Sequence, residues 1–227
     1  MVLVFDLDDT LYDETGYVMS GFKAVADFAD RTWRIPSADS FTFMERIFKE
    51  TGRGNVFDKM LKKYNKYSKS NVSRCLSVYR SHEPAIHLLP DATRCLKRFG
   101  HLPLYVVTDG NKIVQHKKIK ALGLETMVKK AFITYRHGVK NSKPSPYCFL
   151  KISNLEKTEP ESIFYIGDNP NKDFIGIKPL GFKTIRILRG EHKGVRLKVE
   201  HDAHKEILSL DEITPELLKE MENNERS

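Results

Sequence analysis

Acidic residues gather near the start of the chain, directly after a short apolar run. The segment FDLDDTLYD, from residue 5 to residue 13, brings Asp6, Asp8, Asp9 and Asp13 close together. Carboxylates this close repel one another, and those bordering a buried strand lose solvation unless something compensates them. In an extended strand Asp6 and Asp8 point to the same side. Such a pair suits a hard divalent ion such as Mg²⁺, although a solvated acidic turn has the same pattern.

A second acidic strand end lies far along the chain. Asp168 follows the apolar residues 164–167, and Asp173 comes shortly after it in GDNPNKD. Carboxylates at the ends of two strands could share one cation. Glycine, asparagine, proline and aspartate are also ordinary turn residues, so a polar strand-to-helix turn is the alternative.

Two further segments carry groups that could bind phosphate. The first follows the apolar residues 105–107 and consists of Thr108, Asp109, Gly110 and Asn111. A hydroxyl and free backbone amides there could hold phosphate oxygens, although a helix cap has the same composition. The second contains Lys143, which would be a solvated lysine if it stood alone. Each segment has an ordinary structural explanation, but together they indicate a site for phosphate and metal.

In this order and spacing, the segments resemble the motifs of the haloacid dehalogenase-like superfamily, most of whose members are Mg²⁺-dependent phosphatases. The first motif, D-x-D-x-T, corresponds to Asp6, Asp8 and Thr10. Thr108 corresponds to the second motif, Lys143 to the third, and Asp168 with Asp173 to the fourth. The resemblance covers residues 2–188.

The resemblance implies a role for each matching residue. Asp6 would attack phosphorus and form an aspartyl-phosphate, and Asp8 would protonate the leaving alcohol and then activate water. Mg²⁺ would be held by Asp6, by Asp8 through its backbone carbonyl, and by Asp168. Phosphate oxygens would be bound by Thr108 and the neighbouring Asp109 and Gly110, and Lys143 would neutralise charge. Asp173 would orient Lys143 or a metal-bound water, and Thr10 would steady Asp8.

The elements that must position these residues alternate along much of the chain. Short apolar runs predict strands buried in a parallel sheet, at residues 2–7, 104–108, 131–134, 163–167 and 184–188. Helices are predicted between them, including 112–122 and 171–180, and Asp91 is expected to cap another. The pattern predicts a doubly wound, Rossmann-like α/β core.

The alternation stops between residues 14 and 88, where every apolar stripe has helical spacing. We therefore predict a core at residues 1–13 and 89–213, a helical subdomain at 14–88, and a C-terminal helix and disordered tail at 214–227. The family resemblance implies that the helical insert is a mobile cap of the C1 type. Within it, Arg53 stands between two glycines and could reach an anionic substrate, or could simply be solvated in a turn.

Composition narrows the possible partners and the compartment. The net charge of +8, from 38 basic and 30 acidic residues, could attract anions. No nucleic-acid recognition motif accompanies it, so we do not expect a nucleic-acid binder. The three cysteines are widely spaced and predict reduced thiols in a cytoplasmic protein. Asp6 interrupts the apolar start, so no signal peptide is expected, and no apolar run is long enough for a membrane span.

Several functional hypotheses remain open. A phosphomonoesterase acting on a small phosphorylated metabolite, such as a sugar phosphate or nucleotide, is the leading one, and its oligomeric state is not predicted. A sugar phosphomutase would use the same residues but exclude water from the second step. Asp8 argues against carbon–halogen cleavage, because related dehalogenases lack that acid. A non-catalytic module that kept the fold is the alternative outside enzymes. The basic tract at residues 192–198 could contact a partner or a polyanion, but we interpret it as a solvated loop.

Overall fold

The computed structural model describes residues 1–223 and divides into two compact units. Met1–Glu14 and His87–Ser227 form the first, termed the core unit, and Thr15–Ile86 form the second, termed the helical unit. The chain thus leaves the core after its first strand and returns to it once.

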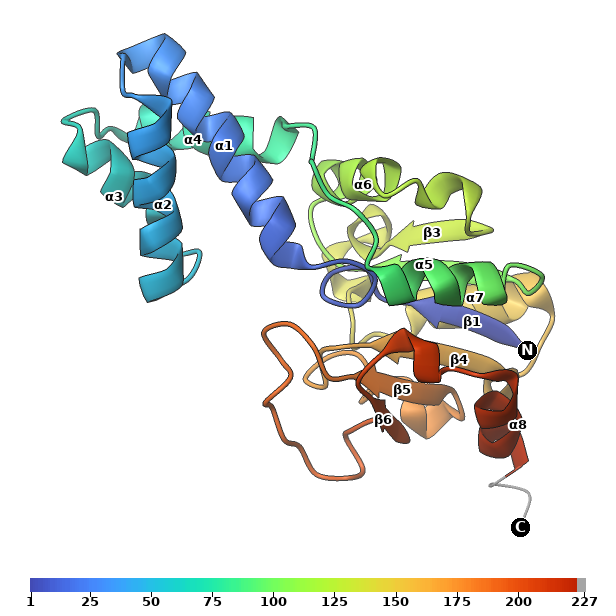
Figure 1. Ribbon diagram of the computed structural model, residues 1–227. Helices are drawn as coiled ribbons and strands as arrows, with labels where there is room; N and C mark the ends of the chain where they lie inside the picture. The colour runs from blue at the N-terminus through green and yellow to red at the C-terminus, as the bar shows by residue number, and fades with distance from the viewer. Residues whose placement is uncertain (224–227) are drawn as a thin grey trace. The chain divides into compact units, whose positions relative to one another are not determined.

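The core unit is built on a sheet of six parallel strands in the order β3-β2-β1-β4-β5-β6 (Figure 1). The strands are β1 Val2–Phe5, β2 Leu104–Thr108, β3 Lys130–Ile133, β4 Ile163–Gly167, β5 Lys183–Ile187 and β6 Lys205–Ile207. This arrangement confirms the predicted doubly wound α/β fold. The short edge strand β6 was not predicted, because two of its three residues are charged and exposed.

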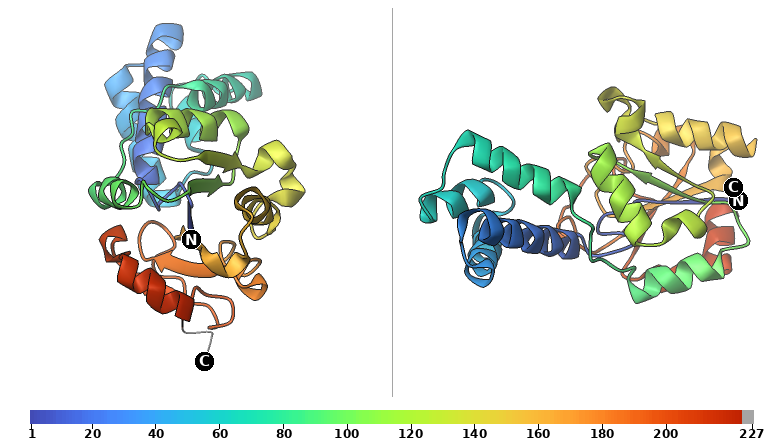
Figure 2. Two further views of the ribbon diagram at one scale, coloured as in Figure 1. Left: turned by 90° about the vertical axis from the view of Figure 1, so that its right-hand side faces the viewer. Right: turned by 90° about the horizontal axis from the view of Figure 1, so that it is seen from above.

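Apolar runs form the central strands because both faces of the sheet are covered. Every residue of β1, β2, β4 and β5 is buried. Val4 and Tyr165 belong to a cluster that also contains Phe149 and Ile152 of α7 (Tyr147–Glu156). The right-hand view of Figure 2 places α7 on one side of the sheet and α5 (Pro90–Arg98) on the other.

Two local predictions for the core unit were wrong. Residues 171–180 do not form a helix: they follow β4 as a series of turns that ends in a short 3₁₀ segment, Lys178–Leu180. Asp91 does not cap α5, because the helix begins at Pro90 and Asp91 lies in its first turn. The helix predicted at 112–122 is present as α6 (Lys112–Ala121).

The helical unit has its own apolar core. Its helices are α1 Glu14–Trp33, α2 Ser37–Thr51, α3 Val56–Lys63 and α4 Lys69–Ser81. Val18, Phe22, Val25 and Ala29 of α1 are buried together with residues of the other three helices, as the stripe predicts. Trp33 packs at the edge of this cluster against Phe28.

The C-terminal segment contains one more helix, α8 (Pro215–Asn223). The disordered tail predicted beyond it falls on residues outside the described part of the chain. Among the described residues, no helix is long and apolar enough to cross a bilayer.

Asp91 joins three segments of the core unit. Its carboxylate accepts hydrogen bonds from the backbone N–H of Ala92 on α5 and of Leu210 near the C-terminus, at 2.8 and 2.9 Å. It also forms an ion pair with Arg189, just after β5. Burial alone would raise the pKa of Asp91, but the bonds from Arg189 and Leu210 lower it below its usual value.

We therefore expect Asp91→Asn to lower the free energy of unfolding at pH 7 by about 1–3 kcal/mol. Because a lowered carboxyl pKa stabilises the folded state above the unfolded pKa of about 3.9, the deficit should shrink as the pH falls below about 4. Urea unfolding of both proteins at pH 7 and pH 3.5 measures this. Asp30→Asn, at an exposed position of α1, is the control, and a deficit that does not depend on pH would contradict the ion-pair explanation.

Candidate active site

A hollow of about 180 Å³ opens in the core unit beyond the carboxyl ends of β1, β2 and β4. Ligands of open parallel sheets bind at this edge. Five of the residues that line it were predicted as site residues, namely Asp6, Asp8, Thr108, Asp109 and Asp168. Glu14, Asn169, Lys172 and His192 complete the lining.

Lys143 and Asp6 form a buried ion pair beside this hollow. The Lys143 Nζ lies 2.8 Å from Oδ1 of Asp6 and 2.7 Å from Oδ1 of Asp173. It also donates to the hydroxyl of Tyr165 at 2.9 Å, and that hydroxyl donates to Asp173 at 3.0 Å. All four side chains are buried, so the lysine is held by three oxygens and points one of its protons at Asp6.

Two segments place Lys143 at this position. Asp109, at the end of β2, accepts from the backbone N–H of Lys143 at 3.2 Å and from the Thr134 hydroxyl at 2.6 Å. From the other side, the turn after β4 brings Gly176 against Pro144. A Cβ built on Gly176 would lie 1.7 Å from the Pro144 carbonyl oxygen, so only glycine allows this close approach.

Asp168 completes a carboxylate cluster. Oxygen atoms of Asp6, Asp168 and Asp173 all lie within 4.8 Å of one another. Burial raises the pKa of Asp168 to about 9, and the charges of Asp6 and Asp173 act in the same direction. Burial also raises the pKa of Asp6 to about 6, although Lys143 opposes this shift. Buried carboxylates with too little positive charge around them are a donor set that fits a hard divalent ion.

Asp8 turns its side chain to a different set of partners. Its carboxylate accepts from Lys118 Nζ at 2.6 Å, from Gln115 Nε2 at 2.8 Å, and from the hydroxyl of Tyr12. Burial would raise its pKa, but the charge of Lys118 and these hydrogen bonds lower it below the usual value. The hydroxyl of Thr10 has no hydrogen-bond partner among the described residues, so Thr10 does not steady Asp8 as predicted.

The phosphate-binding residues predicted after β2 take two different positions. Thr108 is buried, and its hydroxyl accepts from Gln115 Nε2 at 2.6 Å, which leaves its own proton available to a ligand. The carboxylate of Asp109 is used to hold Lys143, so only its backbone could contribute to phosphate binding. Gly110 has a φ of +130°, and its backbone lies against the side chain of Gln115.

The chain turns sharply between the segment that carries Asp6 and Asp8 and the start of α1. Asp9 adopts a left-handed conformation with φ of 52°, and its carboxylate accepts from the backbone N–H of Glu14 at 2.9 Å. This turn returns the chain so that Tyr12 reaches Asp8 and Glu14 reaches the hollow.

Sequence reasoning missed several contributors to the site. Gln115, Lys118 and Tyr165 had no assigned role, although Gln115 and Lys118 stand on the stripe of α6 that also carries Ile119. The tract at 192–198 is not simply solvated. Arg186 of β5 is fully buried and donates to the carbonyls of His192 and Val195 at 2.9 and 2.8 Å, and His192 lines the hollow.

One predicted contributor, Arg53, belongs to the helical unit. Arg53 lies in the exposed turn between α2 and α3, and its role in substrate binding stays a prediction. Tyr17 is buried within the unit, where its ring contacts those of Tyr79 and His82.

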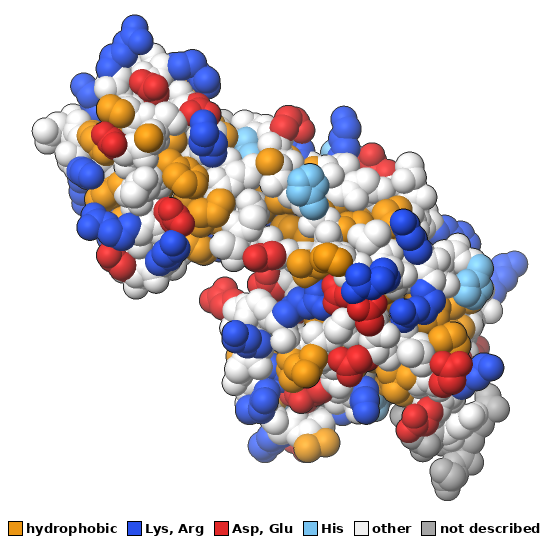
Figure 3. Space-filling model, viewed as in Figure 1, with side chains coloured by type: hydrophobic (Ala, Val, Ile, Leu, Met, Phe, Trp, Pro, Cys, Tyr) orange, Lys and Arg blue, Asp and Glu red, His pale blue; other side chains and the backbone are white. Residues whose placement is uncertain are grey.

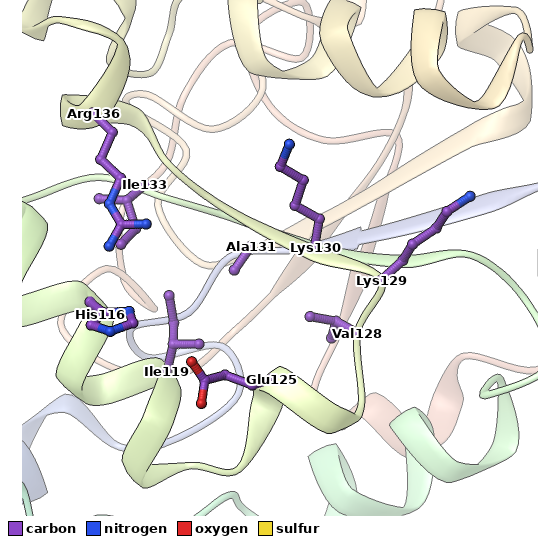
Figure 4. Close-up of a pocket in the computed structure, with 9 residues that line it drawn as sticks. All are labelled: His116, Ile119, Glu125, Val128, Lys129, Lys130, Ala131, Ile133 and Arg136. Carbon is purple, nitrogen blue, oxygen red and sulfur yellow. The ribbon is translucent and has the colours of Figure 1, made fainter.

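A second hollow, of about 240 Å³, lies at the edge of the sheet along β3 (Figure 4). Lys129 and Lys130 border it but point away in Figure 4; Lys129 pairs with Glu156 at 2.7 Å, and Lys130 lies over the Phe132 ring. None of the motif residues lines this hollow.

The fold and the site define a Rossmann-like enzyme with an acidic site at the carboxyl edge of its sheet. A family model of haloacid dehalogenase-like hydrolases matches residues 1–181, so the chain belongs to this family. A glyceraldehyde 3-phosphate phosphatase of Methanocaldococcus jannaschii is 29% identical over 200 residues, which cover 84% of this chain and 86% of that protein. A phosphatase of the same name from Pyrococcus furiosus is 27% identical, with 100% and 95% covered.

Solved structures share the fold. A haloacid dehalogenase-superfamily hydrolase of Geobacter sulfurreducens matches with a TM-score of 0.66 at 16% identity, over 96% of this chain and 95% of that one. A 2-haloacid dehalogenase of Pseudomonas syringae matches with a TM-score of 0.65 at 21% identity, over 96% and 98%. At these identities the likeness extends to the fold alone.

The raised pKa of Asp168 gives a test of the cluster without any substrate. A carboxyl group whose pKa rises on folding makes the folded state less stable as the pH increases from the unfolded pKa, about 3.9, toward the folded value. In the presence of a chelator, we expect Asp168→Asn to melt at the same temperature as the wild type at pH 3, below the unfolded pKa, and at a higher temperature at pH 9.

Saturating divalent cation should narrow this difference, because an ion at 100 times its Kd stabilises the wild type by about 2.7 kcal/mol and the variant has lost a ligand. Thermal melts at three pH values, with chelator and with metal, measure both effects. A difference in melting temperature between the two proteins that changes neither with pH nor with metal would contradict the carboxylate cluster as described.

Proposed function

We propose that this chain is a Mg²⁺-dependent phosphatase that hydrolyses the phosphomonoester of a small phosphorylated sugar metabolite. The buried ion pair between Lys143 and Asp6, at 2.8 Å beside Asp168, is the observation that carries the proposal. Lys143 favours the ionised form of Asp6 against the burial that raises its pKa, and Asp6 lines the hollow. The names of the curated relatives support the choice of a triose phosphate as the first substrate to test.

In the first step Asp6 attacks phosphorus, the P–O bond to the alcohol breaks, and an aspartyl-phosphate forms. The departing oxygen takes the electron pair and receives a proton from the protonated form of Asp8, which is left as a carboxylate. In the second step water attacks phosphorus, Asp8 accepts the proton from it, and the bond to Asp6 breaks to release inorganic phosphate. The hydroxyl of Thr108 donates to a phosphoryl oxygen in both steps.

The carboxylates of Asp6 and Asp168 and the backbone carbonyl of Asp8 would hold the Mg²⁺. When bound, the ion offsets charge between these carboxylates and the phosphoryl group. Lys143 supplies a fixed positive charge beside Asp6, and its hydrogen bond to Oδ1 restrains the rotation of that carboxylate. Asp173 and Tyr165 keep Lys143 in place, at 2.7 and 2.9 Å from its Nζ.

The site supports phosphate-ester chemistry over carbon–halogen cleavage. Asp8 supplies an acid for a leaving alcohol, whereas a halide leaves without a proton, and Asp8 has three donors that keep it in the site. On the face drawn in Figure 3, lysine and arginine side chains are interspersed with acidic ones and do not form one continuous basic surface. This distribution favours a small substrate over the end of a nucleic acid.

The proposal extends to the helical unit as a cap and to a cytoplasmic location. Residues 15–86 would serve as the cap that selects the leaving group, with Arg53 as a candidate contact to an anionic substrate. The three cysteines are buried and free, which supports a cytoplasmic location.

A panel of phosphate esters tests the proposal directly. It should contain glyceraldehyde 3-phosphate, glycerol 3-phosphate, hexose phosphates, nucleoside monophosphates and p-nitrophenyl phosphate, with release of free phosphate as the measurement. We expect phosphate release in Mg²⁺, highest kcat/KM for a short-chain sugar phosphate, and loss of activity on chelation.

Asp6→Asn should lower kcat by about 10³-fold or more, because no other group can form the covalent intermediate. Asp13→Asn changes an exposed carboxylate of the same segment and should leave kcat unchanged. Transfer of phosphate within a sugar without release would indicate a mutase. No turnover of any ester in saturating Mg²⁺ would favour the non-catalytic module.

A further inference from the structure

Lys118 is a buried lysine on a helix that the family motifs do not include. It lies on α6 with 2% of its surface exposed, and its Nζ is 2.6 Å from Asp8 Oδ1 and 3.2 Å from Glu14 Oε1. Lysine is almost never buried unless it is paired, because its ammonium group loses hydration. The cost of burying it here is offset by two carboxylates, one of which is the proposed acid and base.

Gln115 stands one turn earlier on the same helix and reaches the same carboxylate from the side of β2. Its Nε2 donates to Asp8 Oδ2 at 2.8 Å and to Thr108 Oγ1 at 2.6 Å. Because an amide nitrogen carries two protons, one side chain can serve both oxygens. Gly110 lies beside this side chain with a φ of +130°, a backbone conformation that favours glycine.

These contacts leave the Asp8 carboxylate little freedom. Oδ1 accepts from Lys118 and from the Tyr12 hydroxyl, and Oδ2 accepts from Gln115. The donors come from α6 and from the turn after β1, so the carboxylate plane is fixed from two directions. A general acid must lie within hydrogen-bond reach of the leaving oxygen, and small displacements reduce the rate sharply.

We propose that Lys118 and Gln115 are positioning residues, which hold Asp8 in the orientation for proton transfer and, through Gln115, align Thr108 with it. This inference rests on the proposed function. One helix thereby sets the positions of the proton-transfer group and of a phosphate-binding hydroxyl, although these two residues stand 100 positions apart in the sequence.

A double-mutant cycle distinguishes a positioning role of Lys118 from an ion pair with Asp8 that serves only the stability of the fold. The wild type, Lys118→Met, Asp8→Asn and the combined variant are compared in Mg²⁺ on glyceraldehyde 3-phosphate and on p-nitrophenyl phosphate. If Lys118 acts through Asp8, Lys118→Met should lower kcat by about 10- to 100-fold with KM changed by less than about threefold. In the Asp8→Asn background the same change should alter kcat by less than about twofold.

The alkyl ester should be affected more strongly than the aryl ester, because nitrophenolate leaves without a proton. Lys118→Arg should restore part of the activity, since it keeps the positive charge. Lys120→Met, at an exposed position of the same helix, is the matched control and should behave as the wild type.

Removing one partner of a buried pair can prevent folding. Gln115→Leu and Tyr12→Phe therefore form a second arm that removes donors without leaving a charge unpaired, and each should lower kcat on the alkyl ester by at least about fivefold. The inference would be overturned if Gln115→Leu and Tyr12→Phe both kept the kcat of the wild type. It would also be overturned if the fold-losses in kcat from Lys118→Met and Asp8→Asn multiplied in the combined variant. Either result would leave the proposed phosphatase activity intact. A wild type that hydrolyses neither ester would overturn both proposals.

Discussion

The constraint on which the site depends is the cost of gathering carboxylates in a buried place. Asp6, Asp168 and Asp173 approach within 4.8 Å of one another at the carboxyl edge of the sheet, and Asp8 lines the same hollow. Each ionised carboxylate there must be offset by a nearby positive charge or remain protonated. The fold meets this requirement by bringing in two lysines from segments that are distant in the sequence.

The two lysines enter from different sides and serve different acids. Lys143 comes from the segment before α7, where Asp109 and the turn containing Gly176 fix its backbone. Lys118 comes from α6 and reaches Asp8 and Glu14. The parallel sheet makes both approaches possible, because its strands end at one edge and each crossover helix starts there. The helix after β2 and the segment before α7 therefore lie at the same edge as the acids of β1 and β4.

Elements of the fold could be predicted from the sequence where the spacing of their apolar residues allows only one kind of secondary structure. The buried strands were predictable because apolar runs of their length have few alternatives, and the strand ends were predictable as a site because parallel strands bring them together. Residues 171–180 misled the prediction because Phe174 and Ile177 have helical spacing, yet both are buried in turns where Gly176 meets Pro144. The edge strand β6 is three residues long and has no apolar run to indicate it.

Lys118 and Gln115 were missed because they are polar residues on a buried helix face. Gln115, Lys118, Ile119 and Leu122 stand at positions i, i+3, i+4 and i+7 of one helix face, and all four are buried. A pattern that counts only apolar residues assigns the two polar ones to solvent. A glutamine and a lysine on the core-facing stripe of a helix that begins at a phosphate-binding turn are themselves a signal, since burial of such groups is tolerated only where they have partners.

The distribution of positive charge also separates the roles of the carboxylates. Lys118 and the hydrogen bonds to Asp8 lower the pKa of that carboxyl, whereas Lys143 only partly offsets the burial that raises the pKa of Asp6 to about 6. Within the described residues no lysine or arginine forms an ion pair with Asp168, and burial raises its pKa to about 9, with Asp6 and Asp173 adding to the shift and Lys143 opposing it. A lysine or arginine paired with Asp168 would stabilise the fold, but it would compete with a metal ion for the same carboxylate. The burial cost of Asp168 is instead one that a bound divalent ion would offset, so the fold would gain stability when the proposed ion binds.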